Sequence, residues 1–250
     1  MSKEHHIQLE AGDVGRYVLM PGDPGRVEVI AKHLDNAVHV ATNREYVTYT
    51  GYLDGVKVSV TSTGIGCPSA AIALEELVRV GADTFIRVGT SGAIQPGTSS
   101  DELAIITGAI RDEGTSIHYM PPEFPAVANL EIVQALRRAA TATKTPFRLG
   151  ITQSKDSYYG EVEPERSAVP DRLLARWKAW EIGGAICSEM ESSTLFVVAS
   201  ILGVRAGGIM AMWADGEFKG LDSVISTAIG GVRELIKEDS KIKGDNNGDN

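Results

Sequence analysis

The stretch Ser188-Glu189-Met190-Glu191-Ser192 lies where the chain changes from one type of secondary structure to another. Before it, the small apolar run Gly183-Gly184-Ala185-Ile186-Cys187 is typical of a short buried strand. After it, the apolar run at 193–202 is typical of a helix, and Gly203 is suited to end that helix. Two carboxylates therefore lie at the sheet edge where α/β proteins bind ligands. Taken alone, the stretch is explained better by an ordinary helix start, since glutamate suits the helix dipole and serine the cap.

The same alternation of strands and helices extends from about residue 17 to residue 238. Residues 56–63 are rich in β-branched side chains, as strands are, while residues 69–80 place apolar side chains on one helical face. Such alternation predicts an α/β fold, a single domain with a mixed, largely parallel central sheet flanked by helices. Further strands are expected at 16–20, 46–49, 84–88, 103–110, 148–154 and 204–214, further helices at 26–34, 130–141, 172–182 and 223–238, and a loop at 121–128.

Composition limits the classes of function. The 250 residues are enough to bury a sizeable core, and 43% hydrophobic and 23% charged residues are ordinary for a globular protein. A net charge of −9 argues against nucleic acid as a partner, because phosphate backbones require a basic face. The domain is expected to span residues 1–240. A disordered tail is expected at 241–250, where residues 243–250 contain no apolar side chain.

Cys67 and Cys187 have no CxxC partner and lie in apolar or glycine-rich surroundings. Free thiols in a reducing compartment are therefore expected, and a zinc site is not. The N-terminus lacks the apolar segment of a signal peptide, and no apolar run approaches the length of a membrane span. We expect a cytoplasmic protein.

Two turns at strand ends combine glycine with arginine. Pro21-Gly22-Asp23-Pro24-Gly25-Arg26 separates an expected strand from a helix, so its backbone N–H groups and its arginine are suited to an anion. It is neither a Walker A loop nor the dinucleotide motif GxGxxG. Arg87 interrupts the apolar run at 85–88, before Gly89-Thr90, and is costly to bury without an anion or an internal carboxylate. The alternative for residues 21–26 is an ordinary strand-to-helix turn, and the alternative for Arg87 is a structural salt bridge.

Other candidate residues also lie next to expected strands. Arg44 precedes the strand at 46–49 and is either a third anion ligand or a solvated surface charge. The adjacent Tyr158 and Tyr159 offer a stacking surface for a flat ring, although half-buried aromatics at a strand end explain them almost as well. Asp215 follows the last strand, as a helix cap or as an acid that faces a base.

The sequence contains no motif for nucleophilic catalysis. GxSxG, HExxH and a cysteine–histidine pattern are absent, and His6 and His118 are better explained as surface residues. Chemistry that relies on arginines, backbone amides and a carboxylate needs a nucleophile that is already charged. Inorganic phosphate is such a nucleophile.

Taken together, these motifs resemble the uridine phosphorylase branch of the nucleoside phosphorylase superfamily. The resemblance covers roughly residues 6 to 238, in order, and implies the nucleoside phosphorylase fold with its distorted, barrel-like sheet. The segments that carry it are Pro21-Gly22-Asp23-Pro24-Gly25-Arg26, Arg44-Glu45-Tyr46, Ser62-Thr63-Gly64-Ile65-Gly66-Cys67-Pro68-Ser69, Glu75-Glu76-Leu77, Phe85-Ile86-Arg87-Val88-Gly89-Thr90-Ser91-Gly92, Glu123-Phe124-Pro125-Ala126-Val127-Ala128 and Glu189-Met190-Glu191-Ser192.

The resemblance implies a role for each matching residue. The implied phosphate ligands are Gly22, Arg26, Arg44, Arg87 and Thr90, with Arg44 supplied by a neighbouring subunit. The implied ribose ligands are His6, Thr90, Met190 and Glu191, of which His6 reaches across a dimer interface to the 5′ hydroxyl and Glu191 binds the 2′ and 3′ hydroxyls. The implied base ligands are Tyr158, Glu161, Arg166 and Asp215.

The base pocket departs from the family pattern. Glu161 replaces a glutamine that reads the carbonyl and N3–H of uracil, and Asp215-Gly216 replaces an asparagine followed by arginine or glutamine. Purine phosphorylases of the superfamily use an aspartate near Asp215 to protonate the leaving purine. The Asp101-Glu102 segment also departs from the usual Gly-Asp.

The resemblance further implies an assembly. Relatives form a hexamer, a trimer of dimers, and some hold a monovalent cation such as K⁺ between subunits at positions that match Glu45, Ile65 and Ser69. No other cofactor is expected, and inorganic phosphate is the co-substrate.

The sequence therefore leads to one hypothesis and three alternatives. The leading hypothesis is a uridine phosphorylase that converts uridine and phosphate into uracil and ribose 1-phosphate, with Arg87, Glu191 and Arg26 as catalytic residues. Glu161 and Asp215 argue for a purine nucleoside phosphorylase instead. A nucleosidase that uses water would leave three arginines unused, and a nucleoside- or phosphate-binding protein without catalysis is the alternative from another class.

Overall fold

The apolar run around Arg87 becomes β5 (Thr84–Ala93), the strand at which the central sheet closes. In the computed structural model, which describes residues 3–246, β5 pairs in parallel with β10 (Arg205–Trp213) and antiparallel with β9 (Cys187–Glu189). The order β5–β10–β6–β8–β9 returns to β5, so these five strands form a closed barrel. β6 spans Leu103–Asp112 and β8 spans Phe147–Lys155.

A second group of strands extends the sheet from β5. β1 (Tyr17–Met20) pairs in parallel with β5 and with β4 (Val56–Thr61), and β3 (Tyr46–Leu53) and β2 (Asp35–Asn43) follow in antiparallel order. The short β7 (Ala126–Val127) pairs with β6. The predicted α/β fold with a mixed, barrel-like sheet is confirmed.

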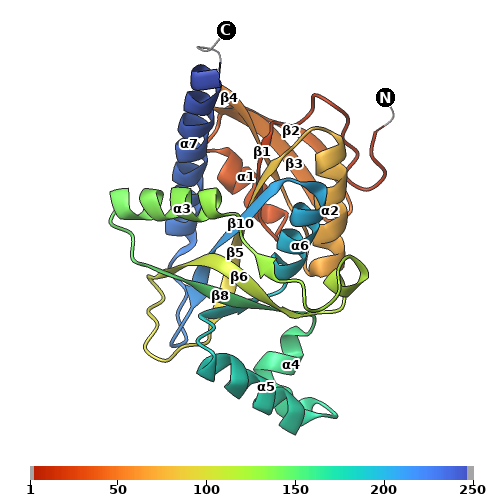
Figure 1. Ribbon diagram of the computed structural model, residues 1–250, viewed down its shortest axis with the longest axis vertical. Coiled ribbons are helices and arrows are strands. Elements are labelled where there is room, and N and C mark those ends of the chain that lie inside the picture. The colour runs from red at the N-terminus through yellow and green to blue at the C-terminus, as the bar shows by residue number, and fades with distance from the viewer. Residues whose placement is uncertain (1–2, 247–250) are drawn as a thin grey trace.

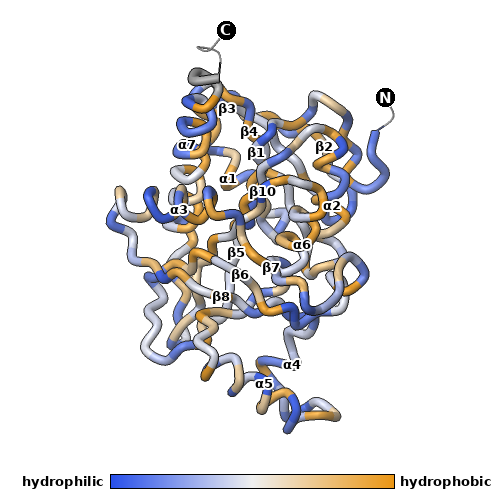
Figure 2. The backbone as a smooth tube through the Cα atoms, viewed as in Figure 1, coloured by the Kyte–Doolittle hydropathy of each residue, from blue (hydrophilic) through white to orange (hydrophobic). Residues whose placement is uncertain are grey.

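Helices cover the sheet on several sides (Figure 1). α3 (Leu130–Ala142) packs against α7 (Leu221–Asn246) on one side, and α2 (Cys67–Arg79) packs against α6 (Ser192–Leu202) on another. Hydrophobic and hydrophilic residues alternate along α7, as expected for a helix with one face on the core (Figure 2). The remaining helices are α1 (Gly25–Ala31), α4 (Tyr158–Val162), α5 (Pro170–Ile182) and the 3₁₀ turns η1 (Ser116–His118) and η2 (Pro164–Arg166).

Some elements differ from the sequence-based expectation. β2 was not predicted, because its side chains are mostly exposed and carry no apolar alternation. The loop expected at 121–128 contains β7. The tail expected from residue 241 is helical at its start, because α7 continues to Asn246, and residues 247–250 lie outside the described residues. None of the helices in residues 3–246 is long and apolar enough to cross a membrane.

Asp239 fastens the last helix to the sheet. Its carboxylate accepts hydrogen bonds from Arg205 Nη2 of β10 and from Tyr17 Oη of β1, each at 2.6 Å. Burial alone would raise the pKa of Asp239, but the hydrogen bonds from Arg205 and Tyr17 outweigh it and hold that pKa below its usual value.

Replacing Asp239 with asparagine should therefore destabilise the protein in a pH-dependent way. A carboxylate whose pKa is depressed on folding contributes stability above its unfolded pKa of about 3.9, and this stability is lost as pH falls through the folded pKa. We expect Asp239→Asn to lower the free energy of unfolding by about 1.5–3 kcal/mol at pH 7 and by much less near pH 3. Urea denaturation at the two pH values measures this, with Asp222→Asn in the same helix as control. An equal loss at both pH values would contradict it.

Candidate active site

The C-terminal ends of β1, β4, β5, β8, β9 and β10 surround a cavity of about 920 Å³. Its walls come from segments far apart in the sequence, including the turn after β1, the turn after β4 and the β9–α6 junction. This is the sheet edge at which α/β proteins bind ligands. The residues that line it are Gly22, Asp23, Pro24, Arg26, Glu45, Gly64, Ile65, Arg87, Thr90, Ser91, Gly92, Lys155, Tyr158, Glu161, Val162, Ser188, Glu189, Met190, Glu191, Trp213 and Phe218.

Arg87 is 5% exposed and extends from β5 into this cavity. Its Nη2 donates to Glu191 Oε2 at 2.5 Å, and its Nη1 donates to the carbonyl of Met20 at 3.3 Å. Among the described residues, its buried Nε has no hydrogen-bond partner. A Cβ at Gly22 would lie 3.3 Å from Nη2, so the glycine brings bare backbone against the guanidinium.

Arg26 adds a second positive charge beside the first. It belongs to α1 and is partly buried, with its Nε 3.8 Å from Asp23 Oδ2. Burial, together with repulsion from Arg87, lowers the pKa of Arg26, and the nearby Asp23 opposes this shift. Two guanidinium groups that repel each other next to a glycine turn form a site in which an anion would relieve the repulsion.

The two glutamates of the β9–α6 junction have different surroundings. Glu191 is 3% exposed and lines the cavity; its Oε2 pairs with Arg87, and its Oε1 accepts the N–H of Gly66 at 2.7 Å. Gly66 has φ +96°, a conformation that favours glycine. Cys67 Sγ donates to the Met190 carbonyl at 3.2 Å and so links α2 to the β9–α6 junction.

Glu189 instead completes the start of α6. Its carboxylate accepts the backbone N–H of Glu191 at 2.9 Å, the N–H of Ser192 at 3.0 Å and the hydroxyl of Ser154 at 2.5 Å. Burial, reinforced by the charge of Glu191, raises the pKa of Glu189. The geometry therefore gives Glu189 a structural task and leaves Glu191 as the carboxylate that pairs with Arg87.

The opposite wall carries aromatic residues and a second ion pair. Tyr158 is 55% exposed and lies edge-on to Tyr159. Trp213 and Phe218 stack with ring centroids 6.2 Å apart and an interplanar angle of 12°. In the same cavity, Lys155 Nζ lies 2.6 Å from an oxygen of Glu161.

Of the residues predicted from the sequence, most meet at this cavity. The ten that line it are Gly22, Arg26, Glu45, Ile65, Arg87, Thr90, Tyr158, Glu161, Met190 and Glu191.

Five predicted residues do not line the cavity of this chain. His6 pairs with Glu76, its Nδ1 lying 2.6 Å from Oε1, and the Ser69 hydroxyl donates to Glu45 at 2.7 Å. Arg44 is exposed at the β2–β3 turn with φ +54°. Their roles between subunits involve a second chain and stay predictions.

Two predicted base ligands point elsewhere. Arg166 is exposed and pairs with Glu163. Asp215 is exposed in a two-residue turn, with φ +50°, followed by Gly216 with φ +75° and closed by the pairing of Ala214 with Glu217. This Asp-Gly turn is a favoured hairpin turn, so backbone geometry accounts for Asp215.

Lys155, Trp213 and Phe218 also line the cavity, although the sequence alone assigned them no role. A lysine at the end of a buried strand was the available signal for Lys155, because an ammonium in such a place requires a partner. Trp213 lies two residues before the Asp-Gly turn, and that turn brings Phe218 back onto its ring.

Comparison with known proteins identifies the family of this chain. The family model described as the phosphorylase superfamily matches residues 16–234. The chain belongs to this superfamily. It is 45% identical over 247 residues to a uridine phosphorylase of Treponema pallidum, a match that covers 95% of this chain and 96% of the relative.

Two further relatives differ in the base that their names specify. A uridine phosphorylase of Thermococcus kodakarensis is 47% identical over 222 residues, covering 85% of this chain and 77% of the relative. A guanosine phosphorylase of Halorubrum lacusprofundi is 40% identical over 226 residues, covering 89% of each. The comparisons therefore establish the family, whereas the base that this protein recognises has to be inferred from the residues of the pocket.

Removing the Glu189 carboxylate should destabilise the fold. We expect Glu189→Ala to lower the free energy of unfolding by about 2–4 kcal/mol, because it leaves two buried N–H groups and the proton of the Ser154 hydroxyl without an acceptor. Urea denaturation measures the change. The control is Glu28→Ala, which removes an exposed carboxylate paired with Lys32 and should cost less than about 1 kcal/mol. Equal losses for the two variants would contradict the capping role.

Proposed function

We propose that this protein is a uridine phosphorylase, which converts uridine and inorganic phosphate into uracil and ribose 1-phosphate. The observation that carries the proposal is the convergence of Arg26, Arg87 and the Gly22 turn beside Glu191 in one cavity. Phosphorolysis needs a bound anion next to a sugar, and these groups supply both subsites.

The arginines orient the nucleophile. Cleavage of the N-glycosidic bond gives the sugar oxocarbenium character, and a phosphate dianion on the face opposite the base stabilises that charge. Arg26 and Arg87 hold the dianion, with Thr90 beside them, so their contribution is positional and electrostatic. Arg44 of a neighbouring subunit completes the phosphate site in this proposal.

Glu191 is the ribose ligand in the proposal. In the structure it neutralises Arg87, with a contact of 2.5 Å. Phosphate competes for the same guanidinium, and the carboxylate that it displaces is then available to accept hydrogen bonds from the 2′ and 3′ hydroxyls. His6 of a neighbouring subunit binds the 5′ hydroxyl, and Met190 packs against the sugar.

The choice of uridine rests on two observations. Asp215, the residue that would protonate a purine, lies outside the cavity in an exposed turn. Two of the relatives described above are uridine phosphorylases. A guanosine phosphorylase is the second candidate, because the carboxylate of Glu161 suits the neighbouring N–H donors of guanine and because one relative carries that name.

Assembly and location belong to the same proposal. We infer a cytoplasmic hexamer built as a trimer of dimers, in which Glu45, Ile65 and Ser69 hold a monovalent cation between subunits. Ile65 supports this placement, because its apolar side chain is 79% exposed at the edge of the cavity. Hydrogen bonds from Ser69 and from backbone, with the charge of Arg44, lower the pKa of Glu45 against burial and keep its carboxylate available to a cation.

Turnover of uridine that depends on phosphate and on Arg87 tests the proposal. We expect uracil release from uridine only when phosphate is present, and a loss of about 10³-fold in kcat/KM for Arg87→Ala, because an electrostatic ligand of the nucleophile is removed. Arg79→Ala, on the exposed side chain that pairs with Glu4, is the control and should keep wild-type rates. Far-ultraviolet circular dichroism checks that each variant is folded.

The other outcomes have definite meanings. Wild-type rates in a folded Arg87→Ala variant would reject the phosphate site. Cleavage of guanosine or inosine but not uridine would favour the second candidate, and release without phosphate would indicate a nucleosidase. Binding of uridine without turnover would indicate a protein that binds nucleosides but has lost catalysis.

A further inference from the structure

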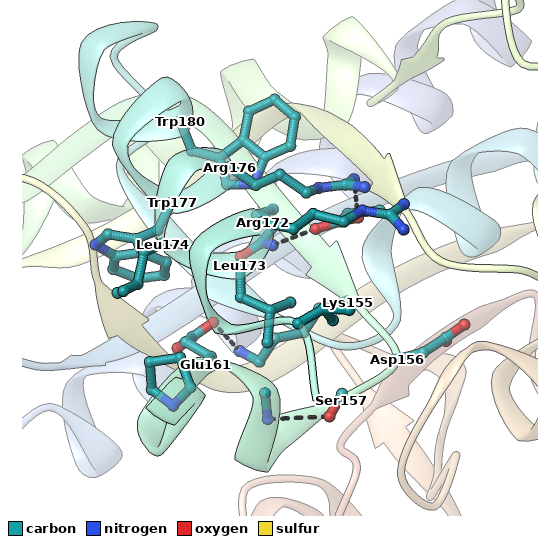
Figure 3. A pocket seen from close by; sticks show the side chains of 15 residues that line it. Lys155, Asp156, Ser157, Glu161, Arg172, Leu173, Leu174, Arg176, Trp177 and Trp180 are labelled. Atoms are coloured by element: carbon teal, nitrogen blue, oxygen red, sulfur yellow. Dashed lines mark hydrogen bonds and ion pairs between the residues drawn. The ribbon is translucent and has the colours of Figure 1, made fainter. Parts of the chain in front are cut away.

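Lys155 and Glu161 form a buried ion pair that the phosphate and ribose subsites do not use. Lys155 ends β8, is 7% exposed and places Nζ 2.6 Å from Glu161 Oε2. Ser157 begins α4 by accepting the N–H of Gly160 at 3.0 Å, and this short helix positions Glu161 opposite the lysine (Figure 3). Both side chains line the main cavity.

Further hydrogen bonds hold the Lys155–Glu161 pair in place. It also lines a second cavity of about 420 Å³, under Leu173, Trp177 and other residues of α5 (Figure 3). Lys155 Nζ donates to the Ser188 hydroxyl at 2.6 Å, and that hydroxyl has one proton, which goes to Glu161 Oε2 at 2.5 Å or to Gln153 Oε1 at 2.9 Å. Gln153 in turn donates to Asp112 at 2.6 Å.

Each partner keeps at least one unused hydrogen-bonding position. Glu161 Oε2 takes both contacts described above, while Oε1 receives no donor from residues 3–246 and lies near the α-carbon of Gly92, where a Cβ would be 3.5 Å away. Lys155 has three N–H donors and uses two of them. The wall of the cavity therefore offers a free acceptor next to a free donor.

We propose that this pair reads the base and stabilises it as it leaves. Glu161 Oε1 accepts the ring N–H of a lactam, the N–H–C=O unit of uracil, and Lys155 Nζ donates to the adjacent carbonyl oxygen. Cytosine presents a bare ring nitrogen where uracil has N3–H, so it faces the carboxylate with a lone pair and is rejected. The inference deepens the proposed function and rests on it.

The same lysine takes part in the chemical step. A phosphate oxygen forms the new bond to C1′ while the bond from C1′ to N1 breaks, and the electron pair of that bond passes into the base. The uracil anion shares this charge with its carbonyl oxygens, one of which the Lys155 ammonium binds; the anion later takes a proton from water. Stabilisation of charge that develops in the transition state increases kcat.

Substrates whose bases leave with different ease test the role of Lys155. We expect Lys155→Met to lower kcat for uridine by about 10²-fold. For 5-fluorouridine, whose base is a more stable anion, the loss should be at least about tenfold smaller. Lys178→Met, on an exposed lysine that pairs with Glu181, is the matched control and should change neither rate. An equal loss for both substrates would show a merely structural role and overturn the inference for Lys155.

Glu161→Gln tests the reading of the ring N–H. An amide can turn to donate to N3 of cytosine, so the ratio of kcat/KM for uridine to that for cytidine should fall at least about tenfold, while the control Glu181→Gln keeps the wild-type ratio. An unchanged ratio in Glu161→Gln would overturn the reading role. The double variant Lys155→Met/Glu161→Gln removes both charges, so no unpaired buried charge is left. It should lose both the stabilisation of the leaving base and the preference for uridine over cytidine.

A binding measurement separates this inference from the proposed function. Calorimetric titration with free uracil and free cytosine needs no turnover, and wild-type protein should prefer uracil while Glu161→Gln loses that preference. If no nucleoside is cleaved but this result is obtained, the proposed function fails and the reading of the base stands. If uridine is cleaved but Glu161→Gln keeps the full preference for uracil, the reading of the base fails alone.

Discussion

The ion pair between Arg87 and Glu191 joins β5, a strand of the barrel, to the turn that begins α6. Both charges are almost completely buried, and further hydrogen bonds offset part of the cost of removing them from water. Gly66 supplies an N–H to Glu191 from a backbone conformation that favours glycine, and Met20 supplies a carbonyl to Arg87. The turns after β1 and β4 and the β9–α6 junction are therefore fixed around one contact, and the cavity follows from their arrangement.

A cavity built in this way has two ends with different chemistry. The end at Arg26 and Arg87 has two guanidinium groups and is bordered by glycine backbone, which suits a phosphate dianion. The end at Lys155 and Glu161 is a neutral pair with one free acceptor and one free donor, flanked by Tyr158, Trp213 and Phe218. Glu191 lies beside Arg87, where a sugar between the two ends would expose its hydroxyls. In the proposed function, the order phosphate, ribose, base follows from the strands that carry each group.

The sequence predicted much of this arrangement, and the parts that it did not predict have physical reasons. Strands with buried β-branched runs, such as β4, and the strand-to-helix junction at Glu191 follow directly from hydrophobic patterning. β2 has mostly exposed side chains, and the five-residue α4 is too short for a helical period, so neither produces a readable pattern. The proposed base ligands depend on local orientation, which hydrophobic patterning does not predict. Asp215 and Arg166 carry suitable chemistry but are exposed, while Lys155 is buried with its charge satisfied by Ser188 and Glu161.

The fate of inorganic phosphate during uridine cleavage tests most directly whether phosphate is the nucleophile, as the proposed role of the arginine end of the cavity requires. Phosphorus nuclear magnetic resonance follows the inorganic phosphate signal while uracil release is measured by absorbance in the same sample. If phosphate attacks the sugar, one phosphate ester of a pentose should form for each uracil released. Uracil release with an unchanged inorganic phosphate signal would contradict that assignment and show that water is the nucleophile.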